Sequence, residues 1–194
     1  MKINKLEKVL VNSKKRAKKN IKLVERLFTQ IDVNNIKKIL EVGCGIGVIS
    51  SYLAEKYRCN VVGIDLDSKQ IKKAKKNNIE NEYSEFNIAD VTKLAFENKE
   101  FDIILSFDVL HHIPNWNQAL HELSRVLKPE GFYIIHDIMV HKSFGKIYKN
   151  CGVFTSDNII DHLKKNHFKV IYEEKLRKKF STHFSIVLKK NLFP

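Results

Sequence analysis

Residues 38–47 read KILEVGCGIG and carry the strongest structural signal in the chain. The first five form a short apolar run that predicts a buried strand. Gly43, Gly45 and Gly47 follow at alternate positions, where they allow positive φ and a close approach of a ligand to the backbone. Residues 49–57 then predict a helix, whose N-terminus favours a negative group. The spacing is not the G-x-G-x-x-G dinucleotide fingerprint, and no Gly-Lys-Ser/Thr follows to make a P-loop.

Strands and helices alternate on the C-terminal side of this loop. Further apolar runs predict strands over residues 60–65, 84–90, 101–106 and 131–139. Helical segments separate them, which is typical of a doubly wound parallel sheet. Two closing runs, 168–173 and 182–188, have no helix between them and predict an antiparallel edge hairpin. Residues 128–131 (KPEG) predict a turn.

Apolar residues recur every three or four positions from Ala17 to Ile31 and predict an amphipathic helix ahead of the first strand. Ser13 or Asn12 is expected to cap it, and Ser68 is expected to cap the helix after the second strand. The expected fold class is therefore α/β: a Rossmann-like, doubly wound, seven-stranded sheet. It is mostly parallel, with an antiparallel C-terminal edge hairpin and an N-terminal helical cap.

Composition places the chain among globular proteins of one domain. It has 194 residues and a mass of 22.7 kDa, and its 43% hydrophobic content suffices for a buried core. No apolar run approaches the ~18 residues of a membrane span, and the Lys-rich N-terminus lacks the apolar region of a secretory signal. Three cysteines without CxxC spacing argue against a disulfide framework and a zinc site. These features predict a cytoplasmic protein.

The formal net charge of +13 lies in the two flanks of the chain. Residues 1–30 carry ten Lys/Arg and two Glu, and residues 141–194 carry twelve basic and four acidic side chains. The middle is mildly acidic. If the two basic flanks met in space, they would form a positively charged surface that could attract an anionic partner. However, Lys outnumbers Arg 30 to 5, and Lys lacks the planar fork for bidentate phosphate contacts, so a solvated surface is the favoured interpretation.

Signals of a ligand site follow the ends of four consecutive strands, and the glycine-rich loop after the first strand is one of them. Asp65 ends the second strand, where a carboxylate can accept hydrogen bonds from both hydroxyls of a ribose. Asp90 ends the third, where it could accept a bond from an adenine amine. The fourth strand ends in the stretch SFDVLHHIP, residues 106–114. Ligands of open α/β sheets bind at the carboxyl ends of the strands, so the combination is more specific than any member.

Together these motifs resemble the class I S-adenosylmethionine-dependent methyltransferases, especially the small-molecule type called methyltransferase type 11. Residues 41–47 look like the glycine-rich motif of that family, and 62–65 look like its acidic ribose motif. Residues 89–91 are similar to its adenine-contacting motif, while 102–113 and 127–132 look like later motifs. The resemblance covers about residues 36–140.

The resemblance implies a single methyltransferase domain over residues 1–194. Residues 1–35 would be the helical cap, 36–140 the cofactor-binding core, and 141–194 the substrate-side segment with a helix and the closing strands. The implied cofactor is S-adenosyl-L-methionine, with S-adenosyl-L-homocysteine as its product. The implied cofactor-binding residues are Glu41, Gly43, Cys44, Gly45, Gly47, Asp65, Leu66, Ala89, Asp90, Val91, Ser106 and Phe107.

Methyl transfer by in-line displacement needs mainly proximity, alignment and a dry pocket. A general base is needed only when the acceptor must lose a proton, and the candidates are His111, His112, His136 and Asp137. We take His111 as the catalytic candidate, although a structural histidine is the favoured interpretation of this residue. Adjacent histidines on a turn rarely face one ion, so no metal site is expected.

The leading functional hypothesis is a methyltransferase for a small-molecule acceptor, acting as a monomer or homodimer. A second is a methyltransferase that acts on RNA or protein through the basic flanks. A third is a non-catalytic module that binds the cofactor without turnover. The glycine spacing disfavours a nicotinamide-dependent oxidoreductase.

Overall fold

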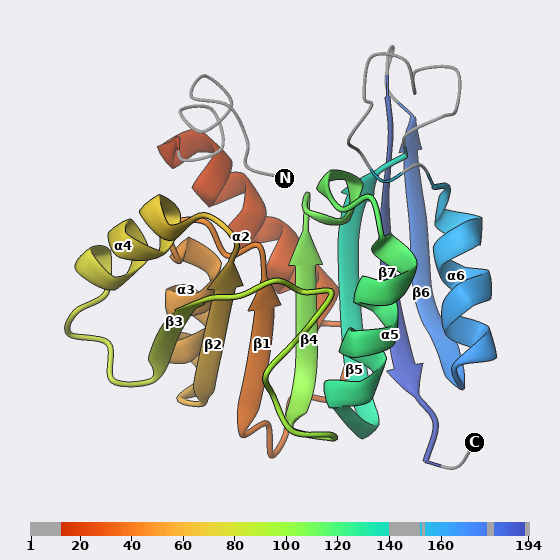
Figure 1. Ribbon diagram of the computed structural model, residues 1–194, viewed down its shortest axis with the longest axis horizontal. Helices are drawn as coiled ribbons and strands as arrows, with labels where there is room; N and C mark the ends of the chain where they lie inside the picture. Colours follow the sequence, from red (N-terminus) through yellow and green to blue (C-terminus); the bar gives the residue numbers. More distant parts are fainter. Residues whose placement is uncertain (1–12, 140–151, 153, 178–180, 193–194) are drawn as a thin grey trace. The chain divides into compact units, whose positions relative to one another are not determined.

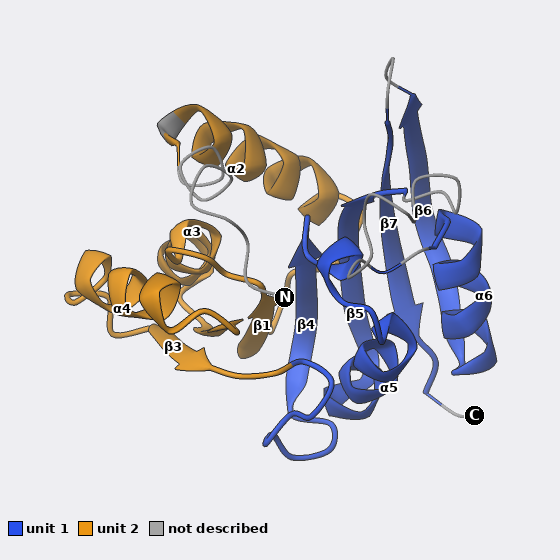
Figure 2. Ribbon diagram, turned by 45° about the horizontal axis from the view of Figure 1, so that its top comes forward, with its two compact units in different colours: residues 1, 91–194 blue, residues 2–90 orange. Residues whose placement is uncertain are grey.

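The computed structural model in Figure 1 describes residues 13–139, 152, 154–177 and 181–192. The described residues fall into two compact units, one that ends at Asp90 and one that begins at Val91 (Figure 2). Residues 1–12 of the predicted helical cap lie outside the described residues. So do residues 140–151, where the predicted substrate-side segment begins, and with them Cys151.

In the first unit the described residues form a sheet of three parallel strands. β1 (Lys38–Val42), β2 (Asn60–Asp65) and β3 (Ser84–Ile88) lie in the order β3-β2-β1. β1 and β2 are buried along most of their length, as expected of parallel strands covered on both faces. Because the three strands are parallel, the residues that follow each of them share one edge of this sheet.

The first helix, α2 (Lys14–Phe28), forms as its apolar stripe predicts. Ser13 caps it by accepting a hydrogen bond from the backbone N–H of Arg16, at 3.3 Å from N to Oγ. The buried stripe of α2 packs against α3 (Val48–Tyr57), and the rings of Phe28 and Tyr57 stack with centroids 5.3 Å apart. The helix is thus fastened to the unit that contains the glycine-rich loop.

The cap predicted for the next helix is wrong by one residue. α4 (Ser68–Asn77) is capped by Asp67, whose carboxylate accepts a hydrogen bond from the backbone N–H of Lys69 at 2.9 Å. Asp67 has the extended backbone of an N-cap, while Ser68 already belongs to the helix.

In the second unit the described strands lie in the order β4-β5-β7-β6. β4 (Phe101–Phe107) and β5 (Leu127–Ile138) are parallel. β7 (Thr182–Lys190) runs antiparallel to β5 and also to β6 (Phe168–Arg177). The predicted C-terminal hairpin is therefore confirmed, and with it the predicted fold class of a mostly parallel seven-stranded α/β sheet.

The predicted start of the fifth strand is wrong. β5 begins at Leu127, four residues earlier than expected. Leu127 pairs with Phe101, but the next pair is Phe132 with Ile103, so residues 128–131 bulge out of the ladder. The turn residues are present where the sequence indicates, but they interrupt one strand instead of preceding it.

Helical segments connect the strands of the second unit. They are the short 3-10 helix η1 (Leu110–His112), α5 (Trp116–Val126) and α6 (Ser156–Lys165). Arg125 at the end of α5 donates hydrogen bonds to the backbone oxygens of Leu94 and Phe96 and forms an ion pair with Glu122. These contacts fasten the chain that leads into β4.

Candidate functional site

The glycine-rich loop joins β1 to α3, as predicted. Gly43, Gly45 and Gly47 all have positive φ, with values of 69°, 55° and 81°. Gly47 is the N-cap of α3, and a Cβ added there would lie 2.6 Å from ring carbons of Phe86. Glycine is required at this position by both the backbone conformation and the lack of space.

Asp65 fastens this loop to the end of β2. One carboxylate oxygen accepts a hydrogen bond from the backbone N–H of Gly45 at 3.1 Å, and the other accepts from the N–H of Asp67 at 2.8 Å. The next residue, Leu66, is 43% exposed although it is apolar. The first unit thus brings a carboxylate, an apolar side chain and the loop backbone together at one sheet edge.

The third strand contributes to the same edge. The backbone N–H of Ala89 donates to the carbonyl oxygen of Asp65 at 3.3 Å, which holds the segment after β3 beside the segment after β2. Asp90 is exposed and ends the first unit. The predicted residues from the first three strand ends therefore lie in one region, apart from Val91, which begins the second unit and is buried.

In the first unit, two of the predicted cofactor residues have buried side chains, Cys44 and Glu41. Cys44 packs in a core cluster with Ile71, Ala74 and Phe86, and burial raises the pKa of its thiol. A thiol in this state is not a reactive nucleophile, so the backbone of Cys44 is the part that a ligand could use. Glu41 is 4% exposed, and its carboxylate accepts a hydrogen bond from the hydroxyl of Ser50 on α3.

Burial raises the pKa of Glu41 to about 7 from an ordinary value of 4.5. Between these two values the folded chain holds a proton that the unfolded chain releases, so Glu41 contributes stability below pH 4.5 that is lost as the pH rises through 7. The free energy of unfolding that is lost in this way is about 3 kcal/mol. We expect the free energy of unfolding to fall over this range in the wild type but not in Glu41→Gln. Urea unfolding of both proteins from pH 5 to pH 8.5 measures it. A difference between the two proteins that does not change with pH would refute this role of burial.

In the second unit, β4 ends in the predicted Ser106 and Phe107. Ser106 is fully buried, and its hydroxyl is 2.9 Å from the Tyr133 hydroxyl. The Phe107 ring is 8% exposed and lies edge-on to the imidazole of His136, with centroids 6.0 Å apart. The Ser106 side chain is thus part of the core, which leaves its backbone as the group available to a ligand.

His111 and Asp137 form a close pair in the second unit. The Nδ1 atom of His111 on η1 lies 2.5 Å from an Asp137 carboxylate oxygen at the end of β5. Asp137 is completely buried, and its oxygens also accept hydrogen bonds from the backbone N–H groups of Val109, Leu110 and Ile138. Because the Asp137 carboxylate is an acceptor, it accepts a hydrogen bond from the N–H at Nδ1 of His111. Nε2 is then the basic nitrogen of His111.

The neighbouring histidine has a different environment. Burial lowers the pKa of His112 to about 4, so this imidazole is neutral near pH 7. The two rings are close, with centroids 3.9 Å apart, and the Nδ1 atom of His111 pairs with Asp137. Sequence reasoning named Asp137 as one candidate base among four. The structure instead gives Asp137 the position of a group that orients His111, and no sequence spacing indicates this pairing.

Comparison with known proteins identifies the family. A protein-family model described as a methyltransferase domain matches residues 40–135. Residues 40–135 belong to the methyltransferase domain family. The match begins in β1 and ends in β5, so it includes residues of both units but stops before Asp137.

Two curated relatives illustrate the methyltransferase family. Methyltransferase GfsG of Streptomyces halstedii is 32% identical over 123 residues, which cover 61% of this chain and 44% of that protein. Fatty-acid O-methyltransferase of Mycolicibacterium smegmatis is 37% identical over 120 residues, which cover 61% of this chain and 43% of that protein. The chain thus matches less than half the length of these relatives.

A solved structure supports the methyltransferase fold. Phosphoethanolamine N-methyltransferase 2 of Haemonchus contortus, in complex with phosphomonomethylethanolamine and S-adenosylhomocysteine, superposes with a TM-score of 0.75. Its sequence identity is 16%, and the alignment covers 87% of this chain and 52% of that one. Among the described residues, no helix has the length and apolar character needed to cross a membrane.

Proposed function

We propose that this chain is an S-adenosylmethionine-dependent methyltransferase that acts on a small-molecule acceptor. The observation that carries the proposal is the contact between the carboxylate of Asp65 and the backbone of Gly45. This contact places a carboxylate beside a loop whose three glycines have positive φ. Both partners lie within residues 40–135, which match the methyltransferase domain. Because the match extends into both units, we propose that residues 1–194 act as one domain.

The groups at this edge fit the adenosine part of the proposed cofactor. Asp65 offers carboxylate oxygens to ribose hydroxyls, the exposed Leu66 offers an apolar face to a purine, and the exposed Asp90 offers an acceptor to its amine. S-Adenosylmethionine supplies an activated methyl group and leaves as S-adenosylhomocysteine. The glycine loop and Ala89 would contact the same ligand. For Val91 and for the backbones of Ser106 and Phe107, which belong to the second unit, the role in cofactor binding rests on the family resemblance alone.

His111 is proposed as the general base for an acceptor that loses a proton. Asp137 holds Nδ1, so the lone pair on Nε2 is available to take the proton of a hydroxyl or ammonium group. Asp137 is a positioning residue because it touches His111 and not the acceptor. The same division of roles between a histidine and a buried aspartate operates in other enzymes that need a base at neutral pH.

The small-molecule class is supported by the name of a relative, the fatty-acid O-methyltransferase. To test it, the protein is incubated with S-adenosylmethionine that carries a labelled methyl group and with fractionated cell extract. We expect label in the low-mass fraction. An Asp65→Ala variant should transfer none above background.

Other outcomes separate the alternatives. Label in nuclease- or protease-sensitive material would replace the small-molecule acceptor by RNA or protein. Binding of S-adenosylhomocysteine without transfer to any fraction would support a non-catalytic module. Transfer that persists undiminished in Asp65→Ala would contradict the proposed cofactor site.

A further inference from the structure

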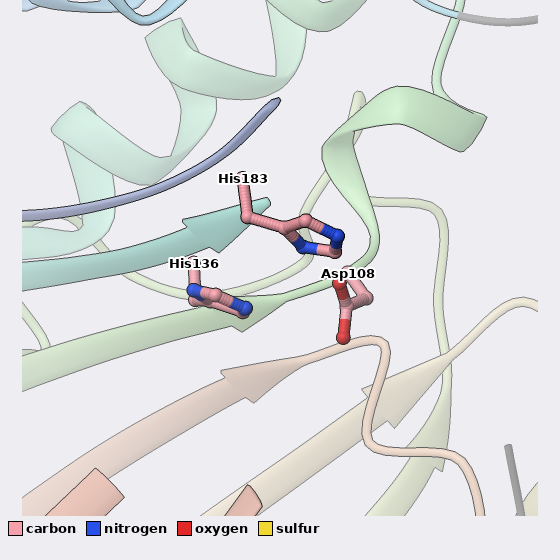
Figure 3. A group of neighbouring side chains, drawn as sticks. All are labelled: Asp108, His136 and His183. Atoms are coloured by element: carbon pink, nitrogen blue, oxygen red, sulfur yellow. The ribbon is translucent and has the colours of Figure 1, made fainter. Parts of the chain in front are cut away.

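A second cluster of polar side chains lies in the second unit, and neither His111 nor Asp137 belongs to it. It consists of Asp108, His136 and His183, which offer ligand atoms that all lie within 4.8 Å of one another (Figure 3). All three residues are partly buried. We propose that these three side chains bind a divalent transition-metal ion. The inference does not depend on the proposed methyl transfer.

The sheet of the second unit places the three residues by its backbone pairing. Asp108 directly follows β4, and its N–H donates to the carbonyl oxygen of His136 on β5 at 2.8 Å. On the other side of β5, His136 pairs with Ser185 and Ile138 pairs with His183. His183 is thus the diagonal neighbour of His136 on one sheet face, within reach of an aromatic side chain. The two imidazoles are stacked, with centroids 5.7 Å apart.

Asp108 reaches the pair through an unusual backbone conformation. Its φ of 53° lies in the left-handed region, which aspartate tolerates better than most residues. Figure 3 shows its carboxylate turned toward the two imidazoles. The three side chains therefore come from three separate strands or strand ends and meet in one place. Ligands on strands are held more rigidly than ligands on a single loop.

Neighbouring groups orient the His136 ring for a metal. Nδ1 of His136 lies 3.0 Å from the hydroxyl of Ser185, and that hydroxyl is 3.4 Å from a carboxylate oxygen of Glu174 on β6. Because the hydroxyl directs its single proton to Glu174, it accepts the proton of Nδ1. The lone pair of His136 is then on Nε2, which Figure 3 shows on the side of Asp108. Metal-binding histidines commonly have this kind of support for the second ring nitrogen.

The donor set defines the class of ion. Two imidazole nitrogens and one carboxylate oxygen suit zinc, iron(II), cobalt(II) or nickel(II) better than magnesium or calcium. With metal–ligand bonds of about 2.0–2.2 Å, tetrahedral ligand atoms lie roughly 3.4 Å apart, so the side chains would close by about an ångström on binding. Three protein ligands leave a coordination position open to water or to a substrate oxygen.

The sequence did not indicate this cluster. The expectation of no metal site rested on the cysteine spacing and on the adjacent pair His111 and His112, none of which belongs to the group. His183 lies 75 positions after Asp108 in sequence number and has no motif around it. Only the order of β4, β5 and β7 brings the three together.

Cobalt(II) is a suitable probe because its visible absorption reports coordination by protein ligands. Untagged, metal-stripped protein is titrated with cobalt(II), and bound cobalt is then displaced with zinc. The wild type should take up one ion per chain. Asp108→Asn, which suits the left-handed backbone, and His183→Asn should abolish the absorption at the same cobalt concentration. Ser185→Ala keeps all three ligands and should weaken binding by about 10- to 100-fold.

His167→Asn is the matched control. His167 is an exposed histidine in the turn before β6, and its φ of 65° suits asparagine. This variant should bind cobalt as the wild type does, and melting curves of all variants establish that they fold. Wild-type protein without saturable cobalt uptake would overturn the proposal. So would folded Asp108→Asn and His183→Asn variants that bind as the wild type does.

Discussion

Replacement of His111 by asparagine is expected to lower kcat for methyl transfer by about 100- to 1,000-fold, the usual contribution of a positioned general base. The reason is the loss of Nε2, the nitrogen that the pairing of Nδ1 with Asp137 leaves basic. Affinity for S-adenosylhomocysteine should change little, because His111 is not among the residues that we assign to the cofactor. Steady-state kinetics with the identified acceptor, together with calorimetry of the product, separate the two effects.

Asp137→Asn tests the positioning role. The amide would still accept hydrogen bonds from the backbone, but it would no longer fix the proton of His111 on Nδ1. We expect kcat to fall, as it does in His111→Asn, and the pH dependence of kcat to shift. A merely structural role of Asp137 would not shift that pH dependence. The matched control is His121→Asn, since His121 is exposed on α5. Wild-type kcat in His111→Asn, at any pH between 6 and 9, would remove His111 from the mechanism.

Gly47→Ala is expected to lower the free energy of unfolding by about 2 to 4 kcal/mol. Part of this cost is the left-handed backbone at φ 81°, and the rest is the contact of the new Cβ with the Phe86 ring. Chemical unfolding of the purified variant measures it. The variant should also bind S-adenosylhomocysteine more weakly, since the loop must shift to relieve the contact.

A second substitution separates the two causes. Phe86→Leu shortens the side chain that the new Cβ would meet, so Gly47→Ala should cost less in that background than in the wild type. We expect the two changes to couple by at least about 1 kcal/mol, which is well above the usual additivity error. Strictly additive effects would mean that the backbone conformation alone, and not the space beside Phe86, makes glycine necessary at position 47.

Much of the fold follows from local patterns in the sequence. β1 and β2 have the predicted bounds because each is a short apolar run that stops at a glycine or an acid. The C-terminal hairpin follows from the lack of a helix-length segment between two apolar runs. Alternation with helices predicts the parallel strands, since parallel neighbours need a crossover connection.

The remaining features depend on tertiary contacts that no local pattern contains. The extension of β5 back to Leu127 arises because Leu127 finds a partner in Phe101 across a bulge. The burial of Asp137, and hence its pairing with His111, depends on backbone donors from the segment after β4. The burial of the Ser106 hydroxyl against Tyr133 likewise requires two strands to be adjacent.

Titration calorimetry with S-adenosylhomocysteine measures directly whether Asp65 and the glycine loop hold the cofactor. We predict one site of micromolar affinity in the wild type and a loss of about 100-fold in Asp65→Ala, as expected for two lost hydrogen bonds to a charged group. Asp67→Asn keeps the cap of α4 and should bind as the wild type does. No binding to the wild type, or equal binding to Asp65→Ala, would mean that Asp65 and the glycine loop are not the cofactor site.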